Sequence, residues 1–210
     1  MSISDSYNAW AGSYDSMKNQ TRDLEAEVLR KTFLNPHYGN ILEVGCGTGK
    51  NTGWLAKKAD YVTALDFSSE MIEKAKQKLN SENIIFSQTD ITRPWPVKPG
   101  WANIVVCSLV VEHIENIHFI FEEAAKALKR RGKFYLCELH PLKQYKGSRA
   151  AFKTKDGVLI QPEAFVHHIS DYLAAAKNGG FRLLELHEHF DDRPKENIPR
   201  LVSFLFESVK

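Results

Sequence analysis

The chain has 210 residues, of which 43% are hydrophobic and 26% charged, and its formal net charge at pH 7 is +2. These values are typical of a globular protein, so they exclude a disordered or fibrous chain and give no support to nucleic acid as a partner. The sequence contains no apolar run near the roughly 20 residues of a membrane span. The cysteines Cys46, Cys107 and Cys137 are widely spaced. We therefore expect one cytoplasmic domain over residues 1–210, with reduced thiols, no structural metal and no membrane partner, and the oligomeric state stays open.

Helix-like and strand-like segments alternate along most of the chain. An amphipathic helix is expected over residues 15–33, ended by Asn35-Pro36, so that residues 1–36 form a helical N-terminal segment. Ser68 or Ser69 is expected to cap a later helix that runs to residue 79, and Gly132 to end a helix whose last turn carries Lys129-Arg130-Arg131. The remaining predicted elements of this half are strands over residues 40–44, 61–65, 83–87 and 103–107, helices over 51–59 and 119–128, and a proline-rich loop over 93–100.

The C-terminal part departs from this regular alternation. A strand over residues 133–139 leads into a poorly periodic segment, 140–168, with a hairpin turn signal at Lys155-Asp156-Gly157. A loop of this length usually has a function, and we expect it to cover a substrate site. Ser170 should then cap a helix ended by residues 178–180, before strands over 181–190 and 201–209. Seven strands alternating with helices predict an α/β fold, a three-layer α-β-α sandwich around a mostly parallel sheet.

A glycine-rich loop, Glu43-Val44-Gly45-Cys46-Gly47-Thr48-Gly49, lies between the first predicted strand and its helix. Missing side chains there let backbone N–H groups approach a polar or anionic ligand. A phosphate-binding P-loop would need glycine at Val44 and a hydroxyl at Asn51, so this type is excluded. A dinucleotide fingerprint fails only at Lys50, and Asp66 follows about 20 residues later as a ribose-binding carboxylate should, so an NAD-dependent oxidoreductase remains an alternative.

The arrangement E-x-G-x-G-x-G resembles motif I of class I S-adenosylmethionine-dependent methyltransferases. The similarity continues at Asp66, at Asp90 in Gln88-Thr89-Asp90-Ile91, and in the fourth-strand segment 103–113. The segment 7–15, from Tyr7 to Asp15, looks like the lead-in of the small-molecule branch related to ubiquinone and menaquinone methyltransferases. Asn103 and Arg130-Arg131 depart from the family, which usually has aspartate and a proline-glycine pair at these places.

The resemblance implies an antiparallel last strand, an N-terminal segment that closes over the cofactor, and S-adenosyl-L-methionine as that cofactor, with S-adenosyl-L-homocysteine as product. In the family, the residues matching Asp66 and Asp90 bind the ribose hydroxyls and the adenine amino group. The cofactor residues carried over or expected beside them are Tyr14, Glu43, Gly45, Cys46, Gly47, Asp66, Phe67, Ser68, Met71, Asp90, Ile91, Ser108 and Leu109.

Methyl transfer depends mainly on alignment of the nucleophile, but a hydroxyl acceptor also needs a base near neutral pH. His113 and His140 follow predicted strands at the carboxyl edge of the sheet, so they are the candidate catalytic residues, although a purely structural role stays open for each. His187 and His189 are assigned to one sheet face and not to a metal. The candidate substrate-binding residues are Tyr7, Trp10, Tyr145, His167, His168 and Tyr172.

The acceptor class follows partly from motifs that are missing. The chain lacks the N/D-P-P-Y motif of base-amine enzymes, a Pro-Cys setting at Cys107, the paired-glutamate hairpin of arginine methyltransferases and an acidic metal cluster near Ser108. A small-molecule acceptor with an oxygen, nitrogen or carbon nucleophile remains, and its identity stays open. A non-catalytic interaction module that binds S-adenosylmethionine is a further alternative.

Overall fold

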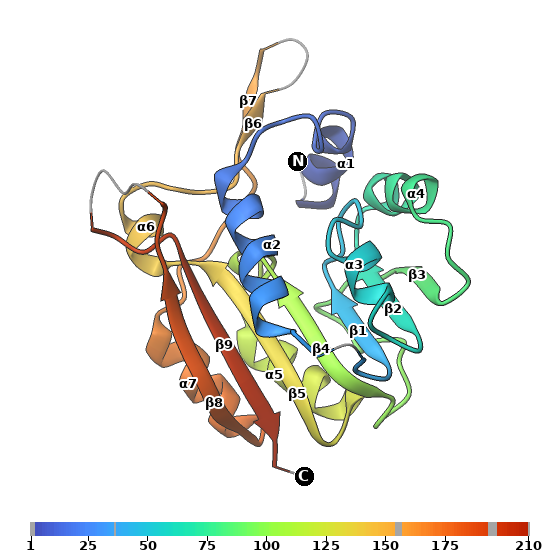
Figure 1. The fold of residues 1–210 in the computed structure, drawn as a ribbon. Helices are drawn as coiled ribbons and strands as arrows, with labels where there is room; N and C mark the ends of the chain where they lie inside the picture. The colour runs from blue at the N-terminus through green and yellow to red at the C-terminus, as the bar shows by residue number, and fades with distance from the viewer. Residues whose placement is uncertain (1–2, 36, 154–156, 193–196, 210) are drawn as a thin grey trace.

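The computed structural model describes residues 3–35, 37–153, 157–192 and 197–209. Its centre is a seven-stranded sheet with the strand order β3-β2-β1-β4-β5-β9-β8 (Figure 1). The neighbouring strands pair in parallel from β3 to β5, whereas β9 is antiparallel to both β5 and β8. The predicted mostly parallel sheet with an antiparallel last strand is therefore confirmed. The strands are β1 (Ile41–Val44), β2 (Val62–Asp66), β3 (Ile84–Gln88), β4 (Ala102–Ser108), β5 (Leu128–Leu139), β8 (Phe181–His189) and β9 (Leu201–Ser208).

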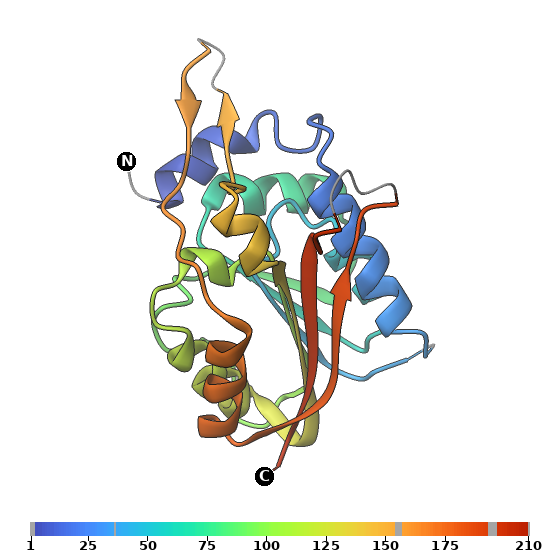
Figure 2. The same ribbon diagram turned by 90° about the vertical axis from the view of Figure 1, so that its left-hand side faces the viewer.

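Helices cover both faces of the sheet and complete the predicted three layers (Figures 1 and 2). Helices α2 (Gln20–Thr32) and α3 (Thr52–Ala56) pack on one face, and α5 (Ile117–Ala127) and α7 (Ile169–Asn178) pack on the other. Because side chains alternate along a strand, Ile41 joins the α2 and α3 cluster while Leu42 joins the α5 and α7 cluster. Helix α4 (Ser69–Lys78) packs against β2 and β3.

The N-terminal region contains two helices where one was expected. Helix α1 (Ile3–Ala11) was not predicted, and α2 begins at Gln20 because the Asn19 side chain accepts a hydrogen bond from the Arg22 backbone N–H at 3.1 Å. The Ser68 cap of α4 is confirmed, since its hydroxyl accepts from Met71 N–H at 3.1 Å. Pro36, expected to end the first helix, lies outside the described residues.

The prediction for Lys129-Arg130-Arg131 was wrong. Helix α5 ends at Ala127, and Leu128 takes an extended backbone (φ −76°, ψ 142°) that lets it pair with Ala102 of β4. The three basic residues therefore lie in β5. Gly132, which we expected to end the helix, follows them in the same strand. Arg131 adopts a φ of 58°, in the left-handed region that side chains disfavour. This is where the family usually places glycine.

The segment after β5 folds into α6 (Pro141–Tyr145) and a hairpin of β6 (Phe152–Lys153) and β7 (Leu159–Ile160). The antiparallel pair β6 and β7 confirms the predicted hairpin, and Lys155-Asp156 of the predicted turn signal lie outside the described residues. Figure 2 shows the hairpin beside α1, where Phe152 packs in one cluster with Trp10. The expected cap at Ser170 was wrong, because His168 occupies the cap position and its backbone N–H donates to the Asp171 carboxylate at 2.8 Å. Within the described ranges, no helix is long and apolar enough to cross a membrane.

Replacing Arg131 with glycine should stabilise the protein. Arg131→Gly removes a side chain from a left-handed backbone, a conformation that costs a non-glycine residue about 1–2 kcal/mol. The ion pair lost with Glu207 is 3.7 Å long and its Arg131 end is exposed, and Glu207 keeps its ion pair with Arg182 at 2.6 Å, so little is lost. Thermal unfolding should show a midpoint raised by roughly 2–4 °C. The matched variant Arg130→Gly should give no increase, and an increase of the same size in both would contradict the assignment.

Candidate functional site

A cavity of about 540 Å³ opens at the carboxyl ends of β1, β2 and β4, within the range of about 300–1,000 Å³ that is usual for small ligands. It lies at the edge where ligands bind in open parallel sheets. Every predicted cofactor residue except Ser68 lines it: Tyr14, Glu43, Gly45, Cys46, Gly47, Asp66, Phe67, Met71, Asp90, Ile91, Ser108 and Leu109. Ser68 instead caps α4 and donates its hydroxyl to Asn8 Oδ1 at 2.7 Å.

Two glycines of the loop have distinct physical roles. A Cβ on Gly45 would lie 2.1 Å from Val110 Cγ2, so packing against the segment after β4 leaves no room for a side chain there. Gly47, with φ at 53°, has open space where its Cβ would be. At Gly45 the loop therefore packs tightly against the rest of the protein, whereas at Gly47 it leaves space for a ligand.

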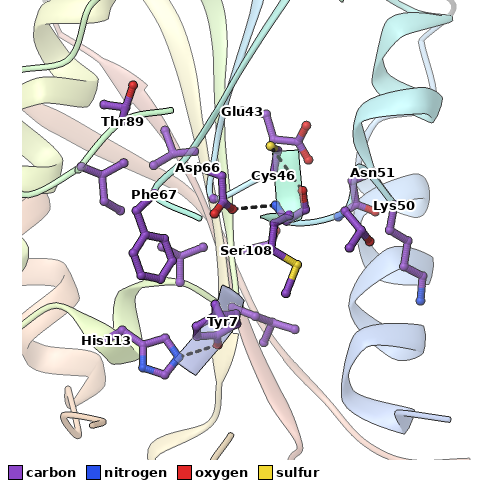
Figure 3. A pocket seen from close by; sticks show the side chains of 18 of the residues that line it. Tyr7, Glu43, Cys46, Lys50, Asn51, Asp66, Phe67, Thr89, Ser108 and His113 are labelled. Atoms are coloured by element: carbon purple, nitrogen blue, oxygen red, sulfur yellow. Dashed lines mark hydrogen bonds between the residues drawn. The ribbon is translucent and has the colours of Figure 1, made fainter. Parts of the chain in front are cut away.

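Asp66 holds this loop in place from the end of β2. Its carboxylate accepts hydrogen bonds from the backbone N–H groups of Gly47 (Oδ2, 2.7 Å) and Ser68 (Oδ1, 2.9 Å), and Figure 3 shows the bond to the glycine loop. Burial raises the pKa of Asp66 to about 6, against the effect of these bonds. Each oxygen keeps a further lone pair, so the carboxylate can still accept from a diol.

Two more buried carboxylates lie below the loop. Glu43 accepts from the Thr52 hydroxyl at 2.5 Å, and burial together with the nearby acids raises its pKa to about 8. Glu25 of α2 accepts from Asn51 Nδ2 at 2.9 Å, and burial raises its pKa as well. Asp66 faces the same cavity. A concentration of buried acids favours a ligand that carries positive charge.

The sequence did not identify Glu25 as part of a site. A glutamate on an amphipathic helix normally lies on the solvent side, but Glu25 is only 3% exposed and lines the cavity. The spacing of α2 alone does not reveal this, because Glu25 follows Leu24 and precedes Ala26 in a segment rich in charges. Its polar neighbour Asn51 comes from beyond the glycine loop, and only the fold brings the two together.

Tyr7 and His113 form the opposite part of the cavity. The Tyr7 hydroxyl and His113 Nε2 are 2.8 Å apart, and His113 Nδ1 is 2.7 Å from the Glu163 carbonyl oxygen (Figure 3). Because a carbonyl only accepts, Nδ1 carries the proton and Nε2 accepts from Tyr7. The Glu112 carboxylate lies 3.8 Å from Nε2. Burial raises the pKa of Tyr7 well above its usual value, so its hydroxyl is protonated.

His140 is not brought to the cavity, contrary to its prediction as a catalytic residue. Its Nδ1 accepts from the Leu142 backbone N–H at 3.1 Å, which caps α6, and its Nε2 is 2.8 Å from the Glu188 carboxylate. Both ring nitrogens are therefore engaged, one by α6 and the other by β8. Among the described residues that line the cavity, His113 is the only histidine.

Four predicted substrate residues also lie away from the described lining of the cavity: Tyr145, His167, His168 and Tyr172. Tyr172 is 2% exposed and packs against Phe204 in the core between α7 and the sheet. His167 Nε2 lies 2.7 Å from the Ile114 carbonyl oxygen and fixes the segment after β4. Tyr145 is 59% exposed, and its hydroxyl forms a hydrogen bond with the ring of His168. These residues shape the scaffold around the cavity.

The two remaining predicted substrate residues belong to α1. Tyr7 lines the cavity, whereas Trp10 lies behind it, 4% exposed, and stacks on Phe152 with ring centroids 4.8 Å apart. The segment 140–168 thus contributes to the site through its backbone groups and through the packing of Phe152 against α1. The Glu163 carbonyl orients His113, and the Phe165 N–H donates to the Glu112 carbonyl at 2.7 Å.

The late histidines lie on one face of β8, as expected. His187 and His189 have ring centroids 6.3 Å apart, and His189 Nε2 is 2.8 Å from the Ser203 hydroxyl, while Glu188 contacts His140 from the other face. In the part of the chain that the structure describes, no group of three or more histidine, cysteine or acidic side chains has the arrangement of a metal site.

The strand order separates the two cofactor classes that the glycine loop left open. Dinucleotide-binding folds have the order 3-2-1-4-5-6. Here the antiparallel β9 inserts between β5 and β8. Lys50, which breaks the dinucleotide fingerprint, also bonds outward to Asp23 at 2.6 Å. Both observations disfavour a dinucleotide.

The chain is similar to several proteins that are named as methyltransferases. Residues 42–136 match a family described as a methyltransferase domain. The chain is 25% identical to an uncharacterized methyltransferase of Emericella nidulans, over 87% of this chain and 76% of that protein. It is 33% identical to the demethylmenaquinone methyltransferase of Tropheryma whipplei over 48% of this chain, and it spans only 42% of that protein.

A solved structure shares the complete fold. The N-methyltransferase NodS of Bradyrhizobium japonicum, determined in complex with S-adenosyl-L-homocysteine, superposes with a TM-score of 0.75 and covers 100% of both chains at 15% identity. At this identity the likeness concerns the fold alone.

The stability of the ligand-free protein should fall as the pH rises from 6 to 9. The pKa of Glu43 is about 8 in the folded protein against 4.5 ordinarily, so the folded state keeps a proton that the unfolded state loses. The stabilisation from this proton is complete below about pH 4.5 and is lost as the pH passes 8. Since one pKa unit corresponds to about 1.4 kcal/mol, urea unfolding at the two pH values should differ by more than about 1 kcal/mol.

The variant Glu43→Gln should reduce this pH dependence, because its side chain does not titrate. The exposed residue Glu27 offers a matched control, and Glu27→Gln should keep the full difference. A pH dependence unchanged in Glu43→Gln would contradict the assignment.

Proposed function

We propose, from the premise that this chain is a class I S-adenosylmethionine-dependent methyltransferase, that it methylates an O–H or N–H group of a small molecule. The observation that carries the proposal is that one cavity joins the glycine loop and Asp66 to the Tyr7 and His113 pair. A cofactor bound at the first end would direct its reactive group toward the second. S-adenosylmethionine, when bound, supplies an electrophilic methyl group on a positively charged sulfur.

The residues at the glycine loop fit this cofactor. The open space at Gly47 admits the cofactor chain, and the free lone pairs of Asp66 suit two ribose hydroxyls. Phe67 and Ile91 line the cavity beside Asp66 as apolar surfaces for adenine. Asp90 stands at the rim, where its Oδ1 accepts from the Thr92 hydroxyl at 2.6 Å and its second oxygen faces Arg93 at 3.4 Å. The three buried acids favour a cation.

The Tyr7 and His113 pair supplies a route for the proton of the acceptor. His113 Nε2 already accepts from the Tyr7 hydroxyl, so an acceptor that donates to the Tyr7 oxygen would pass its proton there while Tyr7 passes its own to Nε2. The resulting imidazolium is stabilised by the Glu163 carbonyl and by the Glu112 carboxylate. Tyr7 and His113 thus take up the proton that the acceptor loses when it is methylated.

A small acceptor is supported by the enclosure of the site. Helix α1 places Tyr7 over the cavity, and the hairpin behind Trp10 holds this helix down. A relative that is 33% identical over part of its length is named for the methylation of demethylmenaquinone, and a structural neighbour is an N-methyltransferase. The first name gives demethylmenaquinone as an acceptor, and the second gives methylation at nitrogen.

The variant Asp66→Ala should weaken the binding of S-adenosylhomocysteine by well over tenfold, because it leaves the ribose hydroxyls and two backbone N–H groups without their acceptor. Isothermal titration calorimetry measures the affinity, and NADH serves as the competing probe. The exposed residue Asp60 gives the matched control Asp60→Ala, which should bind normally. Near-normal affinity in Asp66→Ala would refute its role, and binding of NADH alone to the wild type would refute the proposed function.

The variant His113→Ala should lower turnover by about 10²–10⁴-fold while the affinity for S-adenosylhomocysteine stays within about twofold, since it removes only the proton acceptor. Turnover is measured as transfer of a tritiated methyl group to a panel of phenols, quinols, amines and carboxylic acids. Tyr7→Phe should lower turnover in the same direction. The exposed His118 offers the control His118→Ala. Unchanged turnover in His113→Ala would return this histidine to a structural role.

A further inference from the structure

Three oxygen atoms below the glycine loop are buried without a partner. Glu25 Oε1, Asn51 Oδ1 and Ser108 Oγ have no hydrogen bond to any residue that the structure describes. All three side chains line the cavity, and they come from α2, from the residue directly before α3, and from the end of β4. A buried polar atom that stays unpaired costs free energy, so these positions point to a ligand.

The three side chains form one group. Asn51 Nδ2 donates to Glu25 Oε2 at 2.9 Å, which leaves the other oxygen of each side chain free. The Ser108 hydroxyl lies near enough to the Glu25 carboxylate to lower its pKa, although burial raises that pKa more. Glu25 is 3% exposed, and it is the only one of the three that carries charge. The group therefore offers three acceptors, one of them anionic.

The position of the group identifies the part of the cofactor that would reach it. Figure 3 shows Asn51 and Lys50 on the opposite side of the cavity from Phe67 and Thr89. If adenine and ribose occupy the side of Phe67 and Asp66, the amino-acid end of the cofactor extends toward Asn51. That end carries an ammonium group, which has three N–H donors and no acceptor.

We propose that Glu25, together with Asn51 and Ser108, binds the ammonium group of the amino-acid end of the cofactor and so selects ligands that carry this cation. This inference rests on the proposed function. Three donors meet three acceptors, and the charge of Glu25 is matched by the charge of the ammonium group. The site thereby distinguishes a complete cofactor from an adenosine thioether that lacks the amino acid.

Arg22 gives the carboxylate of the same amino acid a partner. Its two terminal nitrogens donate to the Tyr14 and Met17 carbonyl oxygens, each at 2.9 Å, so the guanidinium group is fixed in place at the cavity. Its Nε is buried and lacks a partner within the described chain. A donor fixed one turn of α2 from Glu25 suits a ligand in which an ammonium group and a carboxylate share one carbon.

Calorimetric titration of the full chain with two probes tests this inference. The probes are S-adenosylhomocysteine, which carries the amino acid, and 5′-methylthioadenosine, which lacks it. Glu25→Gln should weaken S-adenosylhomocysteine by more than about tenfold and leave 5′-methylthioadenosine within about twofold, because hydrogen bonds to charged groups contribute about 1.5–3 kcal/mol. Ser108→Ala should act in the same direction, and Glu27→Gln on the exposed side of α2 should change neither affinity.

The outcomes separate the inference from the function on which it rests. If the wild type binds both probes and Glu25→Gln weakens neither, or both equally, the ammonium site is wrong while the cofactor assignment stands. If the wild type binds neither probe, the proposed function fails and the inference fails with it. Thermal unfolding of each variant shows whether it still folds. If Glu25→Gln does not fold, Ser108→Ala is the deciding variant. Weaker binding of S-adenosylhomocysteine alone then supports the site, and unchanged binding of both probes overturns it.

Discussion

The buried carboxylate of Asp66 is the constraint on which the site depends. It fixes the glycine loop through Gly47 N–H and the start of α4 through Ser68 N–H, so that the ends of β1 and β2 keep one geometry. The same serine caps α4 and donates to Asn8 of α1 at 2.7 Å. One short chain of hydrogen bonds thus joins the loop, the sheet edge and the N-terminal helix. A carboxylate is suited to this position because it accepts several donors at once.

Much of the scaffold could be predicted from local patterns. Alternating segments gave the layers, and Ser68 and the glycine loop are recognisable because capping and open backbone need particular residue types. Most of the residues predicted to bind the cofactor were chosen for the same reason, because they lie in the loop or close after a strand, and all of them but Ser68 line one cavity. Each of these signals acts within a few residues of sequence.

The rest depends on contacts between distant segments. His140 looks like a catalytic base at a strand end, but Glu188, far along the chain, engages its ring. Tyr172 looks like a pocket wall, but the fold turns it into the core against Phe204. Glu25 carries no signal until α2 packs beside Asn51. Burial and the choice of partner are tertiary properties, and the sequence around a residue does not contain them.

The stack between Trp10 and Phe152 has a kinetic consequence. Helix α1 is held from above by this stack and from below by the bond between Tyr7 and His113, whose ring is in turn held by the segment after β7. Detaching α1 alone would expose Phe152, which is 2% exposed in the closed arrangement. Exposing this apolar surface costs free energy, so the stack slows any movement of α1 that leaves the hairpin in place, and it links two segments that lie about 140 residues apart in the sequence.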